Sequence, residues 1–189
     1  MDKKGYRFLG IDDSHFNRNE KFAYLVGCIV RQNDLIEGFL VEKIEVDGLD
    51  STEKIIKMVK NKRFYQQIRA IFLAGITFAG FNIANLEEIY EKTNKPIIVL
   101  MKDYPDFLAI ENALRKYFSD WKERLEIIKK AGNVIKLKDF YVQLKGISEK
   151  EALELIEISR KHSKVPEALR IAHMVASAIS LGYSSKKVL

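Results

Sequence analysis

The order of expected strands and helices constrains the fold of this chain more than any other feature of its sequence. Three segments, 6–11, 21–32 and 36–46, are rich in apolar, aromatic and β-branched residues and are joined by short connections, which favours antiparallel neighbours. From residue 50 onward the pattern changes to helices that alternate with strands. This order predicts an α/β fold in which one mixed sheet is covered by helices on both faces.

The later elements are expected to follow one another at short intervals. Helices are expected at 50–61, 85–94, 106–118, 120–132, 148–162 and 166–182, and a hairpin-like strand pair at 133–137 and 140–146. We expect a single sheet to contain 6–11, 22–31, 36–46, 68–73 and 96–100. The segment 6–11 should lie centrally, so that its carboxyl end opens onto the crevice where ligands of such sheets bind.

Composition bounds the class of protein. A length of 189 residues fits one domain, so we expect 1–189 to form a single domain. No apolar run is long enough to span a membrane, the start of the chain lacks the apolar core of a signal peptide, and the single Cys28 cannot form an internal disulfide. We therefore expect a cytoplasmic protein with no membrane partner. The net charge of +6, to which Lys186 and Lys187 contribute near the C-terminus, favours nucleic acid as a partner, although a lysine-rich surface also serves solubility.

Two adjacent acids stand where the first expected strand ends, in the segment "FLGIDDSHF" (8–16). Neighbouring carboxylates suit a cation such as Mg²⁺, but Asp12 and Asp13 could equally shape a turn with Ser14. We favour a functional role for Asp12 and a turn role for Asp13, which stays a second candidate ligand. His15 either contacts a phosphate or is a surface histidine.

The segment "DSTE" (50–53) opens the first expected helix. Asp50 and Glu53 have the spacing of a capping box, and acids are favoured near a helix N-terminus. Capping explains both residues without a metal, yet one acid can cap a helix and still face a crevice. Lys54, Lys57 and Lys60 recur every third residue on the same helix and form either a phosphate-binding stripe or a solvated face.

The segment "GITFAGFN" (75–82) follows an expected buried strand. Gly75 and Gly80, with Thr77 between them in the sequence, permit tight turns. Glycines at these positions would also let backbone amides approach a ligand such as a phosphate closely. Phe78 and Phe81 could stack on an extruded base. A structural turn whose aromatic side chains fill the core is the alternative.

Four segments together resemble an uncharacterised, largely archaeal family that is related to endonuclease V. They are "GIDDSHF", "VDGLDSTEKI", "LAGITFAGFNIANL" with "KPIIVLMKDYPD", and "PEALRIAHMVASAI", and they occur in the expected order over nearly the whole chain. The resemblance implies a ribonuclease H-like fold and an endonuclease V-like domain over 1–189. It also implies Mg²⁺ or Mn²⁺ held by carboxylates near a nucleic-acid phosphodiester.

The resemblance also assigns site positions. Asp12 matches the first acid of those nucleases, Asp50 or Glu53 the second, and His173 the last member of the site, although His173 lies on an apolar helix and could instead be a core histidine. The third acid is replaced by Ala74, which cannot ligate a metal. The catalytic residues implied are thus Asp12, Glu53 and His173, and the implied metal ligands are Asp12, Asp50, Glu53 and Asp13.

Because one acid is missing, the sequence predicts a nucleic-acid-binding protein with a degraded or altered metal site. The alternative is an active Mg²⁺- or Mn²⁺-dependent endonuclease that cuts phosphodiesters in DNA or RNA. Enzymatic activity and oligomeric state stay undecided at this level.

Overall fold

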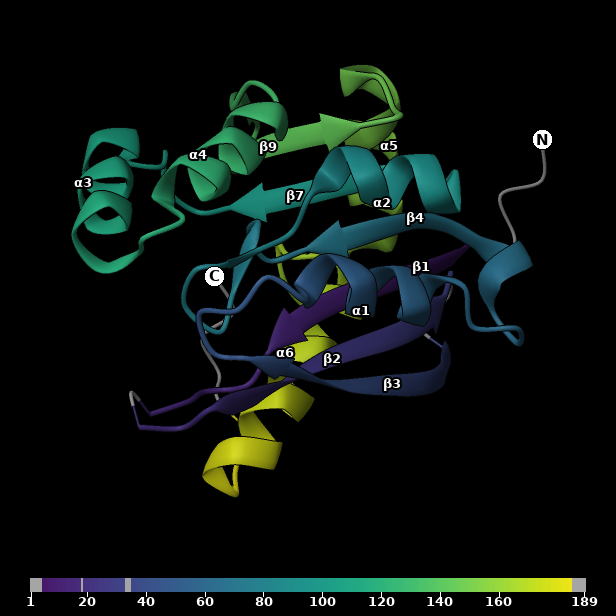
Figure 1. The fold of residues 1–189 in the computed structure, drawn as a ribbon. Helices are drawn as coiled ribbons and strands as arrows, with labels where there is room; N and C mark the ends of the chain where they lie inside the picture. The colour runs from purple at the N-terminus through teal and green to yellow at the C-terminus, as the bar shows by residue number, and fades with distance from the viewer. Residues whose placement is uncertain (1–4, 18, 33–34, 185–189) are drawn as a thin grey trace.

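The computed structural model describes residues 5–17, 19–32 and 35–184, so the two lysines near the C-terminus lie outside the described residues. Its main feature is a seven-stranded sheet in the order β3-β2-β1-β4-β7-β9-β8 (Figure 1). The strands are β1 Arg7–Asp13, β2 Phe22–Arg31, β3 Leu35–Glu45, β4 Ile68–Leu73, β7 Ile97–Met101, β8 Ile135–Leu137 and β9 Phe140–Lys145.

The five strands expected to share one sheet do so. β1 pairs antiparallel with β2 and parallel with β4, so its carboxyl end lies at the edge where the carboxyl end of β4 also lies. The hairpin of β8 and β9 joins the same sheet beyond β7, which the sequence pattern did not specify. β1 is therefore an interior strand, third from the β3 edge, and not the middle strand of the sheet.

Helices cover both faces, as expected. They are α1 Ser51–Val59, α2 Leu86–Thr93, α3 Phe107–Tyr117, α4 Trp121–Lys130, α5 Glu149–Ser159 and α6 Glu167–Leu181, with a short 3₁₀ helix η1 at Tyr65–Gln67. Side chains of Asn85, Asp106 and Ser148 accept hydrogen bonds from the first-turn amides of α2, α3 and α5. Such caps explain why these helices begin within a residue of the expected positions.

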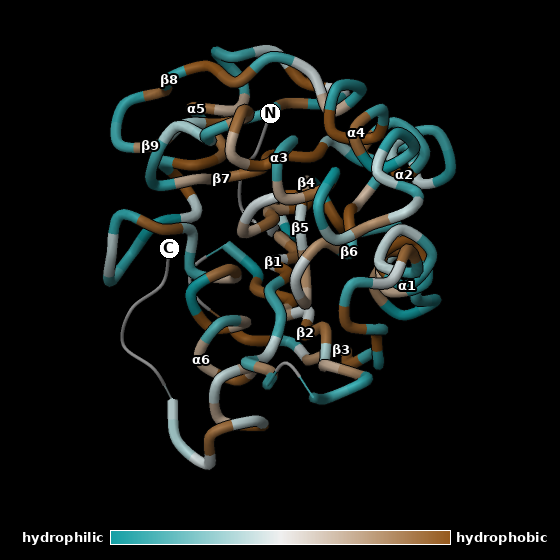
Figure 2. The backbone as a smooth tube through the Cα atoms, turned by 60° about the vertical axis from the view of Figure 1, so that its left-hand side comes forward, coloured by the Kyte–Doolittle hydropathy of each residue, from teal (hydrophilic) through white to brown (hydrophobic). Residues whose placement is uncertain are grey.

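Alternating side chains of the sheet form two apolar clusters. Leu9 and Ile11 of β1 pack with α1 and α2 on one face, whereas Phe8 packs with α5 and α6 on the other. Figure 1 shows α1 and α2 in front of the sheet and α6 behind it, and Figure 2 shows the hydrophobic backbone segments of the strands in the middle of the molecule. Among the described residues, no helix combines the length and apolarity needed to cross a membrane.

Candidate functional site

The carboxyl end of β1 brings together two predicted site residues that are distant in sequence. The Nδ1 atom of His173 on α6 lies 2.7 Å from Oδ2 of Asp12. Both side chains are largely buried, with 15% of the His173 side chain and 10% of the Asp12 side chain exposed. The other carboxylate oxygen of Asp12 accepts a hydrogen bond from the backbone amide of Asp13 at 2.9 Å. Asp12 is thus held in one orientation by α6 and by its own strand end.

Gly10 explains why α6 lies close enough for this contact. A Cβ atom at Gly10 would lie 2.3 Å from the backbone carbon of Ala168 and from the backbone nitrogen of Leu169, so a larger residue does not fit. From this point two strand residues rise about 7 Å to Asp12, while five helical residues rise about 7.5 Å from Ala168 to His173. Because these two rises are nearly equal, Asp12 and His173 lie at about the same distance from the point where β1 and α6 touch.

Asp13 faces the opposite side of the sheet because successive strand residues alternate. Its Oδ2 atom accepts a hydrogen bond from the backbone amide of Ala79 at 2.6 Å. Burial, followed by the nearby negative charge of Asp12, raises the pKa of Asp13 to about 7, although the Ala79 amide acts in the opposite direction. Asp13 therefore anchors the glycine-containing loop instead of a turn with Ser14.

Asp50 occupies the N-cap position of α1 but does not cap it, contrary to the capping interpretation. Its Oδ1 atom accepts hydrogen bonds from the Glu45 amide at 3.1 Å and from Nδ2 of Asn82 at 2.6 Å. The Ser51 amide, at the start of α1, donates instead to Oδ1 of Asn82 at 2.9 Å. Asn82 lies on the short strand β6 Asn82–Ile83 and is fully buried. The helix is thus capped by a residue 31 positions away.

Glu53, which was predicted as a metal ligand together with Asp12, points to solvent. Its side chain is 76% exposed and lies 3.6 Å from the ammonium of Lys54. In the described parts of the chain, no group of three or more His, Cys, Asp or Glu side chains is placed to hold a metal ion. The structure therefore brings His173 to Asp12 but does not bring Asp50 and Glu53 into a ligand set with them.

Ala74 lies where an added acid would meet Asp12. The parallel register pairs Ile11 with Leu73, so the next residues, Asp12 and Ala74, are neighbours at the ends of β1 and β4. Ala74 packs against the apolar cluster that contains α6, the same face toward which Asp12 points. The position predicted to lack an acid is therefore next to the retained acid.

The segment 75–82 is a structured connection with its own small sheet, formed by β5 Thr77–Phe78 and β6. Phe78 is completely buried in the core, so its ring presents no face to a base; stacking is wrong for this residue and the core-filling alternative describes it. Phe81 is partly exposed and packs edge-on against Phe118, with ring centroids 5.5 Å apart. Thr77 is half-buried in β5.

The two glycines of this loop differ. Gly75 and Gly80 both have positive φ, 91° and 89°. A Cβ at Gly75 would meet open space, whereas one at Gly80 would overlap the carboxylate of Asp47. That carboxylate accepts a hydrogen bond from the Phe81 amide at 2.8 Å. Gly80 therefore leaves room for the carboxylate of Asp47, whereas no neighbouring atom requires a glycine at position 75 apart from its positive φ.

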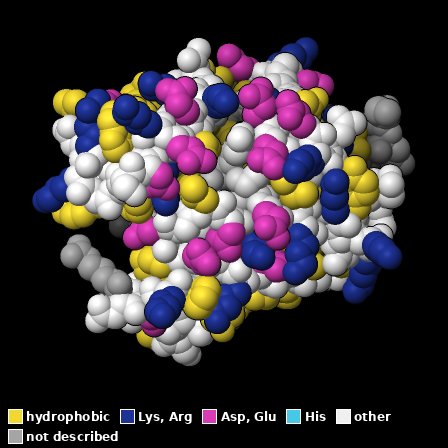
Figure 3. Space-filling view, in the orientation of Figure 1, with side chains coloured by type: hydrophobic (Ala, Val, Ile, Leu, Met, Phe, Trp, Pro, Cys, Tyr) yellow, Lys and Arg dark blue, Asp and Glu magenta, His cyan; other side chains and the backbone are white. Residues whose placement is uncertain are grey.

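The lysines of α1 do not form an unbroken positive stripe. Lys57 pairs with Glu42 of β3 at 2.8 Å and Lys54 lies near Glu53, while Lys60 is exposed. Figure 3, drawn with the α1 face toward the viewer, shows acidic and basic side chains interspersed over this face. The arrangement agrees better with a solvated helix face than with a phosphate track.

Sequence reasoning missed Gly10 and Asn82, which position the site. Gly10 interrupts an apolar strand, and an isolated glycine in a strand is a signal of close backbone approach. Glu167 lies in the segment "PEALRIAHMVASAI", on which the family resemblance partly rests, but no role was predicted for it. It is buried at the start of α6 and is paired with Arg170, whose Nε donates to Oε2 at 2.9 Å. The Glu167 side chain raises the pKa of Arg170 through this hydrogen bond.

Comparison with known proteins identifies the family. The model of the family described as "Endonuclease dU" matches residues 4–180. The chain belongs to the endonuclease dU family. A UPF0215 protein of Methanosarcina mazei is 45% identical over 191 residues, covering 98% of this chain and 96% of that protein. This match confirms the resemblance to an uncharacterised, largely archaeal family that the sequence analysis predicted.

Solved structures confirm the fold of this endonuclease dU family member. A protein of unknown function from Archaeoglobus fulgidus matches with a TM-score of 0.88 and 40% identity, over 94% of this chain and 99% of that one. Endonuclease V of Ciona intestinalis, in complex with a DNA that contains an inosine, matches with a TM-score of 0.58 and 14% identity over 89% and 83%. At that identity the likeness shows the ribonuclease H-like fold alone.

Proposed function

We propose that this chain binds nucleic acid with a phosphate at the Asp12–His173 pair, and that its centre is altered so that phosphodiester cleavage is weak or absent. Membership of the endonuclease dU family, the endonuclease V-like fold and the net charge of +6 support nucleic acid as the ligand. The family description supports DNA that carries a deaminated base such as uracil as the substrate class.

The observation that carries the altered centre is the neighbourhood of Asp12. Its carboxylate contacts an imidazole and a backbone amide, and Ala74 occupies the adjoining place on β4. Two ions roughly 3.5–4 Å apart need shared carboxylates to clamp the attacking and leaving oxygens. Such a pair of ions does not fit this donor set.

One Mg²⁺ or Mn²⁺ ion does fit, because Mg²⁺ is often held by one or two carboxylates together with substrate phosphates and water. Asp12 would hold it, and the ion would supply charge to stabilise a phosphoryl oxygen. His173 orients the Asp12 carboxylate through the 2.7 Å contact between Nδ1 and Oδ2. Burial of both side chains strengthens this interaction by excluding water.

The second candidate function is an active Mg²⁺- or Mn²⁺-dependent endonuclease for DNA or RNA. The specific observation in its favour is the buried Asp12–His173 contact, which pairs a carboxylate with a group able to move a proton. In this case Asp12 and His173 would form the working centre. Glu53, which is exposed, could join only after a rearrangement of the start of α1.

Binding is tested by fluorescence anisotropy with labelled oligonucleotides that contain uracil or hypoxanthine, once with Mg²⁺ and once with EDTA, over a range of salt concentrations. We expect affinity to fall as salt rises, because phosphate contacts release counterions. No binding at low salt would overturn the proposal. Strong Mg²⁺-dependent cleavage by the unaltered chain, abolished by Asp12→Ala, would instead establish the second candidate.

The role of Ala74 is tested by restoring an acid. Ala74→Asp places a carboxylate beside Asp12 and should tighten Mn²⁺ binding by at least tenfold, because a second carboxylate adds both charge and a ligand. Ala74→Asn is the matched control, since it has nearly the same shape and no charge. Isothermal titration with Mn²⁺ measures both variants, and equal affinities would refute the geometry inferred for this position.

A further inference from the structure

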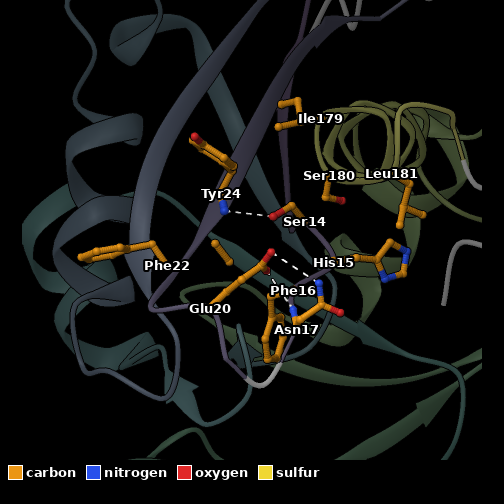
Figure 4. A pocket seen from close by; sticks show the side chains of 11 residues that line it. Ser14, His15, Phe16, Asn17, Glu20, Phe22, Tyr24, Ile179, Ser180 and Leu181 are labelled. Atoms are coloured by element: carbon orange, nitrogen blue, oxygen red, sulfur yellow. Dashed lines mark hydrogen bonds between the residues drawn. The ribbon is translucent and has the colours of Figure 1, made fainter.

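A second concave site lies beside the Asp12–His173 pair. The connection between β1 and β2 and the carboxyl end of α6 enclose a hollow of about 270 Å³ (Figure 4). Side chains that line it include Ser14, His15, Phe22, Tyr24, Ile179 and Leu181. None of them belongs to the site described above.

Four large apolar side chains at this hollow are exposed to solvent. Phe22 and Tyr24 are 44% and 43% exposed, and Ile179 and Leu181 are 42% and 40% exposed. Phe22 and Tyr24 are two residues apart on β2, so both rings stand on the face of the sheet that carries α6. A cluster of exposed apolar side chains on a folded protein often marks a binding site for a ligand or for another macromolecule.

The hollow is held in shape by the strand pairing beneath it. The amide of Ser14 donates to the carbonyl oxygen of Tyr24 at 2.8 Å, and the amide of Tyr24 donates to the Ser14 hydroxyl at 3.0 Å. These bonds continue the β1–β2 pairing beyond Asp13, as the dashed line in Figure 4 shows for the hydroxyl. A site formed in advance loses less entropy when a ligand binds.

The position of the hollow relates it to the phosphate site. Ser14 lies two residues beyond Asp12 along an extended strand, a rise of about 7 Å. Ser180, which also lines the hollow, lies seven residues after His173 on α6, a rise of about 10 Å. A single nucleotide with its flanking phosphate can span such a separation.

The charge at the rim suits the same ligand. The ammonium of Lys43 lies 4.0 Å from the centroid of the Phe22 ring, and the β2–β3 register places Lys43 opposite Tyr24. A cation next to two exposed rings can contact a phosphate while the rings stack on a base. The carboxylate of Glu20, which also lines the hollow, accepts a hydrogen bond from the Asn17 amide at 2.8 Å. The hollow thus combines stacking faces with nearness to the Asp12–His173 pair, and the positive charge of Lys43 lies beside it.

We propose that this hollow is a subsite for one unpaired nucleotide next to the phosphate bound at Asp12 and His173. This inference rests on the proposed function, and it names the substrate class as a nucleic acid with at least one unstacked base. Duplexes without an unpaired base would therefore bind more weakly than single strands. A second copy of this chain is the competing occupant of the exposed apolar surface.

Alanine substitution of Tyr24 tests the subsite. Removal of a stacking ring should weaken single-strand binding by roughly tenfold, with the salt dependence unchanged because no charge is altered. Phe39→Ala is the matched control: Phe39 is 44% exposed and faces the same side from β3, but it does not line the hollow. Tyr24→Phe keeps the ring and should retain wild-type affinity. Fully paired duplex should respond little to any of the three variants.

Anisotropy with a fluorescent single strand and with a fully paired duplex measures these affinities, and thermal midpoints verify that each variant is folded. Equal affinities of Tyr24→Ala and Phe39→Ala would overturn the subsite while leaving the proposed function intact. Absence of nucleic-acid binding by the unaltered chain would overturn both. A sedimenting dimer that Tyr24→Ala dissociates would assign the surface to a second copy and also overturn the subsite.

Discussion

Replacement of Gly10 by alanine should separate the two members of the candidate site without touching either of them. The new Cβ would lie 2.3 Å from backbone atoms of Ala168 and Leu169, whereas ordinary contact begins at 3.4 Å, so α6 would have to retreat by roughly 1.1 Å. Backbone cannot rotate away as a side chain can. The retreat should lengthen the 2.7 Å contact between Asp12 and His173.

The cost follows from overpacking, which typically destabilises a core by about 1–3 kcal/mol. For a chain of this size each kcal/mol lowers the thermal midpoint by about 2–4 °C, so Gly10→Ala should unfold roughly 2–12 °C below the unaltered protein. Calorimetry measures that shift. The ¹H–¹⁵N resonances of the His173 ring report whether its contact with Asp12 persists.

Gly27→Ala is the matched control. Gly27 lies in the neighbouring strand β2, and a Cβ there would first meet flexible side-chain atoms, Cδ1 of Leu9 at 3.1 Å and Sδ of Met58 at 3.4 Å. We expect a thermal midpoint within a few degrees of the unaltered protein and an unchanged ring spectrum for His173. An unaltered midpoint and ring spectrum in Gly10→Ala would refute the argument that this glycine sets the position of α6.

Two further predictions concern buried groups. Asn82→Ala removes the side chain that accepts from the Ser51 amide, so we expect about 2–4 kcal/mol of destabilisation in urea titrations. The control Asn133→Ala alters an exposed asparagine and should change the stability little. Burial, followed by the charge of Glu167, raises the pKa of the Cys28 thiol to about 12. Because the thiolate is the reactive form, labelling of folded protein by a thiol reagent should stay slow up to pH 10 and become rapid in denaturant; rapid labelling of the folded protein would contradict this burial.

Much of the fold could be predicted from the sequence because its elements carry strong local signals. Apolar runs and helix caps are local, and they placed strands such as 68–73 and helices such as 148–162 within a few residues. The joining of the 133–137 and 140–146 hairpin to the main sheet depends on pairing with β7, which no local pattern encodes. Because β9 and β8 add two strands beyond β7, β1 is the third of seven strands and not the middle one.

The candidate site was predictable only in part, for the same reason. Asp12 was found from its place at a strand end, and His173 from a segment that resembles related nucleases. The capping interpretation of Asp50 failed because Asn82, far along the chain, offers the better acceptor to α1. Phe78 looks like a stacking group when its loop is read as open, but tertiary packing encloses it. Long-range contacts decided each of these cases.

The opposite orientation of Asp12 and Asp13 has a mechanical consequence. One carboxylate is tied to α6 and the next is tied to the amide of Ala79 in the glycine-containing loop, so a single peptide unit links elements on the two faces of the sheet. A ligand that draws Asp12 away from His173 therefore also pulls on Asp13 and through it on the loop. Occupancy at one face of β1 is thereby communicated to the other through the covalent backbone.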